Sequence, residues 1–310
     1  MIRVVFMGTP DFSIPVLKGL IDNSEYDVVG VVSQPDKKVG RHQVLTPSPI
    51  SRVAIDNNIK LLRIEKIRNN YQEVLDLNPD IIITCAYGQI IPKEILDYPK
   101  YGCINVHASL LPKYRGGAPI HKAIIDGEKY TGITIMYMDE GMDTGDIISQ
   151  ESLEILDTDT TGSLHDKLSI LGKELLLKTL PNIIVGDITR IKQDENKVTF
   201  AYNIKREDEH IIFNNECKKI YNLVRGLNPF PGAFAILNGK IIKIYGGRIG
   251  NKSTDTPGKI KDICEDGIIV NTNDFDYVIT ELQEEGKKRV KAKEYINGKN
   301  KEQLIGKVFE

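Results

Sequence analysis

An amide, an imidazole and a carboxylate fall within one short part of this sequence. Asn105 and His107 are two residues apart, so on a β-strand their side chains project from the same face of the sheet. Asp143 follows in a loop flanked by glycines, from which a carboxylate can return to that imidazole. These three groups suit the transfer of an acyl-like carbon to a nitrogen, and they need neither a nucleophile from the chain nor a metal.

Each of the three side chains has a role in such a transfer. The Asn105 amide donates a hydrogen bond to a carbonyl oxygen that becomes an oxyanion, a role worth about 10²–10³ in rate. His107 donates to the same oxygen or moves a proton, which contributes about 10²–10⁴. Asp143 orients the imidazole, favours its charged form and accepts the proton released by an attacking amine. A histidine that only completes its hydrogen bonds at a strand end is the alternative for His107.

Strands that alternate with helices must position these side chains. Apolar runs predict buried strands at 2–7, 27–33, 80–85 and 102–106, and helical periods predict helices at about 11–22, 48–57 and 65–77. Thr9 is expected to cap the first helix, with Pro10 in its first turn. This alternation predicts an α/β fold with a Rossmann-like, mostly parallel sheet and helices on both faces. Ligands bind beyond the carboxyl ends of the strands in such sheets, where Asn105 and His107 fall.

The second half of the chain changes character after a long amphipathic helix. Strands are predicted at 131–138 and 146–153 around the Asp143 loop, and the helix follows at about 161–180. Residues 187–203 are polar and show no helical period, and a short helix at about 216–227 comes next. Short β-rich segments then predict a small barrel, at 233–237, 240–247, 258–263, 267–271 and 277–282. We therefore expect a catalytic domain at 1–189, a linker at 190–206 and a C-terminal, OB-like β-barrel domain at 207–310.

Length and composition are those of an ordinary globular protein. The 310 residues are enough for two domains, and the apolar and charged fractions are 41% and 27%. No segment reaches the roughly 20 apolar residues of a membrane span, and the N-terminus is too short for a secretory signal, so a cytoplasmic location is expected. The net charge of −2 divides into +3 for residues 200–310 and −5 for residues 1–199. A more basic C-terminal third favours an anionic partner.

The sequence resembles the methionyl-tRNA formyltransferases over nearly its whole length. The matching stretches are 6–12 (FMGTPDF), 34–36 (QPD), 45–49 (LTPSP), 86–92 (AYGQIIP), 105–120 (NVHASLLPKYRGGAPI), 139–145 (DEGMDTG) and 224–233 (VRGLNPFPGA). Residues 105–112 together with Asp143 are common to N-formyltransferases that depend on 10-formyltetrahydrofolate. The other stretches and the additional domain narrow the resemblance to the family that acts on tRNA.

This resemblance implies that Asn105, His107 and Asp143 are catalytic and that 10-formyltetrahydrofolate is the formyl donor. It implies as well that the folate pocket is lined by Ser109, Leu110, Leu111 and Pro112. The residue types agree, because a turn with two leucines and a proline forms an apolar wall suited to a flat heterocycle. Leucines that only cap the core are the alternative.

The loop at 33–49 is expected to contact the other implied substrate, initiator methionyl-tRNA. It follows a strand end, its prolines and glycine argue against regular structure, and Lys37, Lys38 and Arg41 make it basic. The resemblance makes it the insertion that meets the acceptor end of the tRNA, with Arg41 at the position of an arginine that the family uses there. A solvated loop is the alternative.

A second basic stretch, residues 287–293, lies near the end of the predicted barrel. Lys287, Lys288 and Arg289 belong to it, and Lys205 and Arg206 at the linker add to the same charge. On a small barrel beside an enzyme site, such a run favours contacts with the phosphate backbone of RNA. A solvated charged face is the alternative.

Three other functions fit parts of this pattern. An N-formyltransferase that acts on a sugar nucleotide or on glycinamide ribonucleotide would share the Asn105, His107 and Asp143 set, but it would need neither basic stretch. An RNA-binding or folate-sensing protein on an inactive scaffold would not need an intact set. A formyl-folate hydrolase would replace the amine with water. We expect the tRNA-dependent transferase, acting as a monomer.

Overall fold

The computed structural model describes residues 1–40, 42–298 and 301–310. Its contacts divide the chain into two compact units, which are described one at a time. The first unit comprises residues 1–119, 130–154 and 165–202, and the second comprises residues 120–129, 155–164 and 203–310. The domain limits at 189 and 207 that the sequence suggests remain a prediction.

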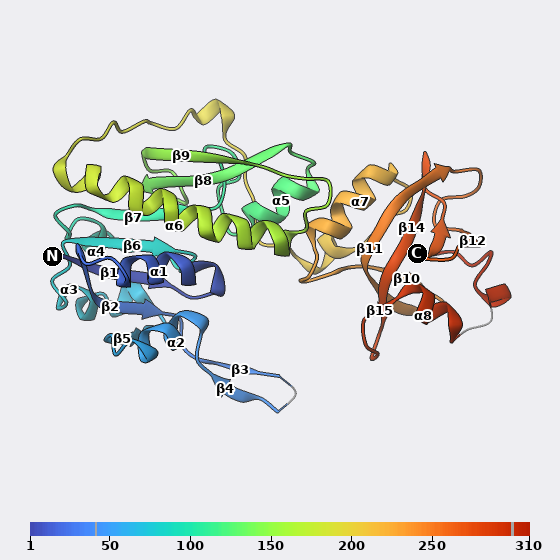
Figure 1. Ribbon diagram of the computed structural model, residues 1–310, viewed down its shortest axis with the longest axis horizontal. Helices are drawn as coiled ribbons and strands as arrows, with labels where there is room; N and C mark the ends of the chain where they lie inside the picture. The colour runs from blue at the N-terminus through green and yellow to red at the C-terminus, as the bar shows by residue number, and fades with distance from the viewer. Residues whose placement is uncertain (41, 299–300) are drawn as a thin grey trace. The chain divides into compact units, whose positions relative to one another are not determined.

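A seven-stranded sheet forms the centre of the first unit (Figure 1). Its strands follow the order β5-β2-β1-β6-β7-β8-β9. Their bounds are β1 Ile2–Gly8, β2 Tyr26–Ser33, β5 Leu61–Arg63, β6 Ile81–Cys85, β7 Cys103–His107, β8 Tyr130–Tyr137 and β9 Ile147–Glu154. Neighbours from β5 to β7 are parallel, whereas β8 and β9 run antiparallel. The predicted Rossmann-like, mostly parallel sheet is confirmed.

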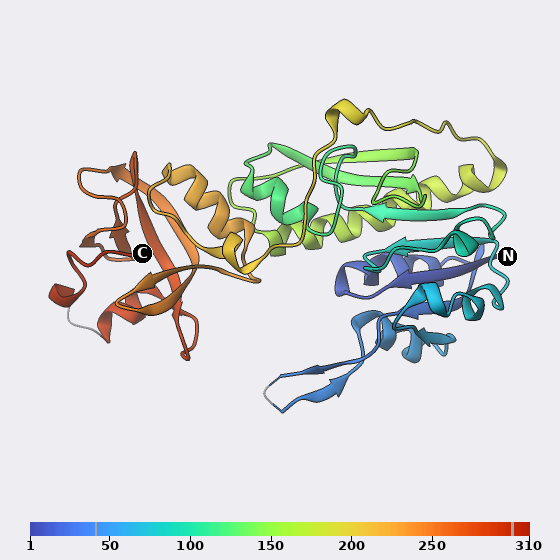
Figure 2. The ribbon, with the colours of Figure 1, turned by 180° about the vertical axis from the view of Figure 1, so that it is seen from behind.

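Helices cover both faces of this sheet, because its strands are apolar on both sides. Val4, Val5, Phe6 and Met7 of β1 are all fully buried although they alternate between the faces. One face carries α1 (Ile14–Ile21), α2 (Pro49–Asp56) and α6 (Thr161–Val185), as Figure 1 shows. The other face carries α3 (Gln72–Leu75) and α4 (Lys93–Leu96), which are seen from behind in Figure 2.

Three predicted helices differ from the structure. The first begins at Ile14 after a short 3-10 turn, Asp11–Ser13, so the expected cap at Thr9 and first-turn place of Pro10 are wrong. The Thr9 hydroxyl instead donates to the Tyr87 carbonyl at 3.4 Å and accepts from a neighbouring backbone N–H. The predicted helix at 65–77 is reduced to a 3-10 turn, Ile67–Asn69, and to α3. Helix α6 passes through Pro181 and ends at Val185, five residues later than expected.

The loop at 33–49 contains regular structure, contrary to the prediction. Strands β3 (Lys37–Val39) and β4 (Val44–Thr46) pair antiparallel as a two-stranded sheet of their own. Val39 and Val44 face each other in this register and both are largely exposed. The β-branched residues that face one another stabilise this pairing. The prolines do not prevent it, because they lie outside the two strands. Arg41 lies outside the described residues.

The second unit is built on an antiparallel sheet of short strands. Its order is β10-β11-β14-β13-β12, and β15 adds to β14. The bounds are β10 Ala233–Leu237, β11 Lys240–Lys252, β12 Ile260–Ile263, β13 Ile268–Val270, β14 Phe275–Glu284 and β15 Val290–Lys291. Helices α5 (Pro119–Ile125), α7 (Cys217–Gly226) and α8 (Ala292–Asn297) accompany it, and 3-10 turns lie at Glu195–Lys197, Arg206–Glu209 and Lys301–Gln303 along this half of the chain.

The C-terminal tail closes this sheet into the predicted small barrel. Glu310 exchanges two backbone hydrogen bonds of 2.8 Å with Ile236 of β10. Ile260 of β12 donates to Lys307 at 2.8 Å and accepts from Gly306 at the same distance. The tail therefore joins the two edge strands, which reduces the backbone edge that they offer to other chains. In the part of the chain that the structure describes, no helix has the length and apolar character to cross a membrane.

Candidate active site

Strand β7 places Asn105 and His107 at its carboxyl end, between β6 and β8. Asn105 lies beside Thr84 of the parallel neighbour β6, and His107 lies beside Thr134 of the antiparallel neighbour β8. This end of β7 is therefore where the parallel part of the sheet meets its antiparallel edge. Side chains two residues apart on one strand share a face, and the structure brings Asp143 to both of them.

The Asn105 amide is fixed with its nitrogen toward Asp143. The Thr84 hydroxyl donates to the Asn105 Oδ1 at 2.9 Å, which leaves the amide N–H groups for the site. The Asn105 Nδ2 lies 3.4 Å from the Asp143 Oδ1. An amide nitrogen carries two hydrogens, so one remains for an oxygen that gains negative charge beside this strand.

Hydrogen bonds to the Asp143 carboxylate and to the backbone of its turn hold this side chain in place. Asp143 has a φ of 55°, in the left-handed region, and its Oδ2 accepts from the Gly116 N–H at 2.8 Å. The Gln193 Nε2 donates to the carbonyls of Asp143 and Gly145, each at 2.8 Å. Gly145 is required in this turn, because a Cβ there would lie 1.9 Å from the Tyr137 carbonyl oxygen. The Asp143 side chain keeps 18% exposure, so its oxygens can still meet a substrate.

His107 is buried, and both of its ring nitrogens face oxygen atoms. The side chain is 6% exposed, with Nε2 3.0 Å from the Tyr114 carbonyl and Nδ1 3.6 Å from the Asp143 Oδ1. A carbonyl only accepts, so Nε2 carries a hydrogen in this arrangement. The doubly protonated ring is the form that donates toward both oxygens.

Gln193 and Arg115 support this site and were not identified from the sequence. Arg115 is 2% exposed, its Nε donates to the Gln193 Oε1 at 3.0 Å, and its guanidinium pairs with Glu195 at 2.8 Å. Gln193 and Glu195 lie in the segment that sequence analysis treats as a linker. That segment shows no periodic pattern, so no local signal indicated that it returns to the active site.

The turn after β7 is held mainly by buried polar contacts. Ser109 is fully buried and its hydroxyl donates to the Lys113 carbonyl at 2.7 Å. The Leu111 side chain is 3% exposed and belongs to a small core cluster, and its N–H donates to Thr134. Leu110 and Pro112 are partly exposed. Of the predicted folate-contacting residues, Leu110 and Pro112 have side-chain surface that a ligand can contact. The side chains of Ser109 and Leu111 are buried and make contacts within the fold.

The basic residues predicted to contact tRNA fall into two groups. Lys37 and Lys38 are exposed on β3, and no ion pair of theirs is found among the described residues. Lys205 lies 3.8 Å from Glu207, and Arg206 pairs with Glu209 while it stacks on the Phe234 ring.

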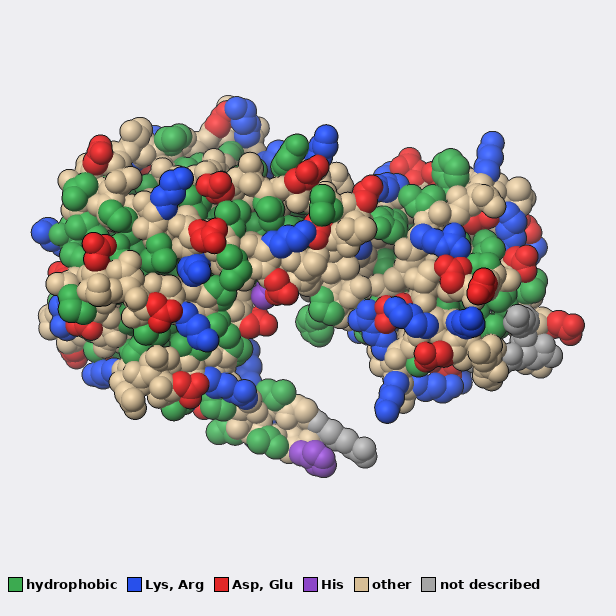
Figure 3. Space-filling model, in the orientation of Figure 1, with side chains coloured by type: hydrophobic (Ala, Val, Ile, Leu, Met, Phe, Trp, Pro, Cys, Tyr) green, Lys and Arg blue, Asp and Glu red, His purple; other side chains and the backbone are tan. Residues whose placement is uncertain are grey.

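The basic run at 287–293 is largely neutralised by carboxylates. Lys287 pairs with Glu284 at 3.1 Å, and Arg289 makes two hydrogen bonds to Glu281, of 2.9 and 3.0 Å. Lys288 is exposed and has no ion pair within the described part of the chain. Figure 3 shows the result, since acidic and basic side chains are interspersed on the visible face of this unit.

Comparison with known proteins matches this sequence to one group of enzymes. A family described as "Formyl transferase" matches residues 2–180, and "Formyl transferase, C-terminal domain" matches residues 203–300. A methionyl-tRNA formyltransferase of Bacillus cytotoxicus is 55% identical over 302 residues, which is 96% of each chain. The chain belongs to the methionyl-tRNA formyltransferase family. The enzyme of the same name from Bacillus subtilis is 52% identical, over 96% of this chain and 95% of its own.

Solved structures show how widely this formyltransferase fold is shared. A methionyl-tRNA formyltransferase from Clostridium thermocellum superposes with a TM-score of 0.57 at 20% identity, over 89% of this chain and all of its own. An N-formyltransferase from Helicobacter canadensis, solved with folinic acid and dTDP-3-aminofucose, has a TM-score of 0.66 at 22% identity and covers 92% of this chain and all of its own. These likenesses show the fold, and the family assignment of this formyltransferase rests on the sequence matches.

Proposed function

We propose that this chain transfers the formyl group of 10-formyltetrahydrofolate to the free amine of initiator methionyl-tRNA, which gives formylmethionyl-tRNA for translation initiation. The observation that carries this proposal is the convergence of Asn105, His107 and Asp143 at the end of β7 in a chain 55% identical to a methionyl-tRNA formyltransferase. Translation takes place in the cytoplasm, where we place the reaction. The enzyme acts as a monomer.

The reaction begins when the amine of the methionyl ester attacks the formyl carbon. The carbonyl oxygen becomes an oxyanion, which accepts hydrogen bonds from the Asn105 amide and the His107 ring. The ammonium that forms gives its proton to Asp143, whose Oδ1 lies 3.4 and 3.6 Å from those two donors. Collapse of the tetrahedral intermediate then expels tetrahydrofolate, whose nitrogen takes up the proton that Asp143 received.

The neighbouring carboxylate explains why the histidine donates rather than attacks. Nε2 donates to the Tyr114 carbonyl at 3.0 Å, whereas Nδ1 lies 3.6 Å from Asp143, beyond hydrogen-bond distance. A hydrogen on Nδ1 can therefore turn to the oxyanion, and it leaves no ring lone pair to attack the formyl carbon. This pairing supports the direct transfer from donor to amine, without a formylated enzyme.

The folate is proposed to lie against the turn at 109–112. Leu110 and Pro112 supply apolar side-chain surface, and the buried hydrogen bonds of Ser109 and Thr134 keep the turn rigid. The Leu111 carbonyl is held by Gln150 at 2.9 Å, which adds to this rigidity. Preorganised surfaces of this kind lower the ordering cost of binding a flat ligand.

The tRNA is proposed to contact the β3–β4 hairpin and the cations of the barrel unit. Lys37, Lys38 and Lys288 support this assignment because they are exposed and lack acidic partners among the described residues. Lys205, Arg206, Lys287 and Arg289 are paired with carboxylates, so each adds less to an attractive field.

The test of this function is formyl transfer to charged tRNA. Formylation of initiator methionyl-tRNA by 10-formyltetrahydrofolate should proceed with a clear preference over elongator methionyl-tRNA. A parallel assay with an amino-sugar nucleotide addresses the main alternative. Transfer to the sugar nucleotide without transfer to tRNA would refute the proposal, and equal use of both tRNAs would remove the initiator specificity.

A further inference from the structure

Two exposed aromatic side chains lie side by side on the segment that returns to the active site. Phe200 is 46% exposed and Tyr202 is 63% exposed, and their ring centroids are 5.5 Å apart with only 5° between the ring planes. Ala201, the residue between them, is fully buried. The alternation of an extended segment thus turns both rings outward, where they stack with their planes nearly parallel and each keeps exposed surface. We call Phe200 and Tyr202 the aromatic pair.

Backbone pairing holds the aromatic pair rigidly against the loop at 114–118. The Arg115 N–H donates to the Thr199 carbonyl at 2.9 Å, and the Ala201 N–H donates to the Arg115 carbonyl at 2.7 Å. The Ala118 N–H then donates to the Ala201 carbonyl at 2.9 Å. These bonds lie on both sides of Phe200, so the ring projects from a fixed backbone.

The same loop holds the catalytic carboxylate. Gly116, between two of these paired residues, donates its N–H to Asp143 at 2.8 Å. The loop and the segment approach so closely that a Cβ at Gly116 would lie 2.8 Å from the Ala201 carbonyl oxygen. The segment that carries the aromatic pair is thus hydrogen-bonded to the loop whose Gly116 N–H holds Asp143.

Exposed, parallel aromatic faces are suited to a flat ring of a ligand. Stacking on such faces is the means by which proteins bind unpaired bases without reading their sequence. The proposed amine acceptor has one base at the required position, since its methionine is esterified to the ribose of the 3′-terminal nucleotide. With the amine at Asp143, one ribose and one ester separate the reaction centre from that base.

We propose that the aromatic pair is the stacking platform for the 3′-terminal base of the aminoacyl-tRNA. This inference rests on the proposed function and names the part of the tRNA that Phe200 and Tyr202 receive. The platform fixes the terminal nucleotide, so the amine reaches the formyl carbon in one orientation. Because every base presents a flat face, the platform aids all methionyl-tRNAs equally and does not discriminate initiator from elongator.

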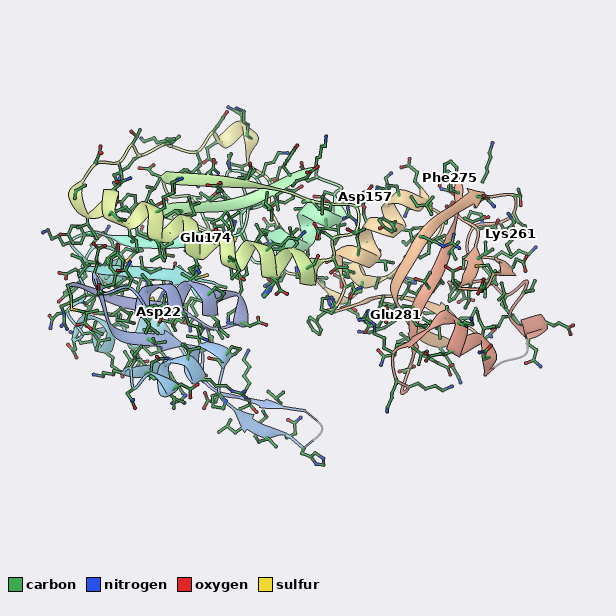
Figure 4. The ribbon with its side chains drawn as sticks, viewed as in Figure 1. Asp22, Asp157, Glu174, Lys261, Phe275 and Glu281 are labelled. Atoms are coloured by element: carbon green, nitrogen blue, oxygen red, sulfur yellow. The ribbon has the colours of Figure 1, made fainter. Side chains whose placement is uncertain are left out.

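Steady-state kinetics of Phe200→Ala, Tyr202→Ala and the double variant test the platform. Loss of stacking on one base should lower kcat/KM for methionyl-tRNA by about 5- to 100-fold, mainly through a higher KM for the tRNA. The KM for 10-formyltetrahydrofolate should stay unchanged. Phe200→Tyr and Tyr202→Phe keep the rings and should remain within about twofold of the wild type. Phe275→Ala is the matched control, because this labelled residue of Figure 4 is also 46% exposed but lies on β14.

A fluorescent base gives a direct readout of stacking. Uncharged tRNA with 2-aminopurine in place of its terminal adenine should lose fluorescence when it binds the wild type, and it should recover that fluorescence with the double variant. A rise in the KM for folate instead of that for tRNA would assign the pair to the folate and overturn the proposal. Equal losses in the ring-keeping variants, or quenching that survives in the double variant, would overturn it too. A wild type that formylates no tRNA would refute the proposed function itself, which is a different outcome.

Discussion

The candidate active site and the basic run at 287–293 both place a carboxylate beside hydrogen-bond donors, but only the first leaves its donors available to a ligand. At the active site, the Oδ1 of Asp143 faces Asn105 and His107 at 3.4 and 3.6 Å, and its Oδ2 is held by a backbone N–H. In the basic run, Glu281 is bonded to Arg289 at 2.9 and 3.0 Å and to Lys291 at 3.2 Å. Figure 4 labels Glu281 on β14, beside this run.

The distances and the exposure of the donors explain the difference. The contacts of the Asp143 Oδ1 with Asn105 and His107 are longer than an optimal hydrogen bond, so these donors keep capacity for a substrate. The contacts around Glu281 are short and join it to cations that are 36% and 66% exposed, so they satisfy these cations and reduce their field. A charged or polar residue type therefore indicates function only when its neighbours leave it hydrogen-bonding capacity for a ligand. The following predictions test this comparison.

Removal of a side chain that we propose to be catalytic should have the largest effect. Asn105→Ala, His107→Ala and Asp143→Ala should each lower kcat by about 10²–10⁴, because each takes away a donor or a proton acceptor in the transition state. Single-turnover formylation measures this loss, and circular dichroism should show a folded protein in each case. His210→Ala, in the barrel, is the control and should retain activity. Near-normal turnover in His107→Ala would contradict the assignment.

A smaller loss is expected when the support of Asp143 is removed. Gln193→Leu deletes two hydrogen bonds of 2.8 Å that hold the turn around Asp143. Since each hydrogen bond contributes about 1 kcal/mol, the loss of both costs about 2 kcal/mol, and we expect kcat to fall about 30-fold, with little change in the KM for either substrate. Asp194→Ala, at the next and more exposed position, is the control. If KM rises while kcat is unchanged, Gln193 is not a positioning residue.

Local sequence patterns explain how much of the fold and of the candidate site could be predicted. Asn105 and His107 were predictable because a spacing of two places side chains on one face, and the apolar runs around them indicated buried strands. The β3–β4 hairpin and the interrupted helix at 65–77 were not predictable, because cross-strand pairing and tertiary packing decide such short elements.

Contacts between segments that are far apart in the sequence set the other limit on what could be predicted. Gln193 reaches Asp143 across 50 residues, and the tail that closes the barrel carries too short a pattern to indicate a strand. The acidic partners of the basic run likewise could not be identified from the sequence. Glu281 precedes Arg289 by eight residues and contacts it only because β14 and β15 pair. A run of one charge in a sequence does not reveal the acidic side chains that the fold places beside it.

Salt dependence of tRNA binding should separate paired cations from unpaired ones. Lys288→Ala should lower the slope of log K against log[salt] by about 1, as expected when one phosphate contact is lost, and Lys38→Ala on the hairpin should do the same. Arg289→Ala should change the slope much less, because Glu281 already offsets its charge. Fluorescence anisotropy with labelled tRNA at several salt concentrations provides the measurement. Equal slopes for all three variants would show that the ion pairs open when tRNA binds.

The smallest effect concerns stability, and its pH dependence follows from Glu281. Hydrogen bonds from Arg289, and also from Lys291, hold the pKa of the Glu281 carboxyl below its ordinary value. A lowered pKa means that the ion pairs stabilise the fold above the unfolded value of about 4.3 and that this stabilisation is lost as the pH falls through the folded value.

Glu281→Gln should therefore lower the free energy of unfolding at pH 7 by less than about 1 kcal/mol, since the cations that it pairs are exposed. The difference from the wild type should be smaller at pH 3 than at pH 7, because protonation of the wild-type carboxyl begins to remove its charge as the pH falls. Urea unfolding at the two pH values measures both quantities, and Glu285→Gln, at an exposed neighbouring position, is the control. A difference that persists undiminished at low pH would mean that Glu281 acts through packing, because only the loss of its charge is reproduced by protonation.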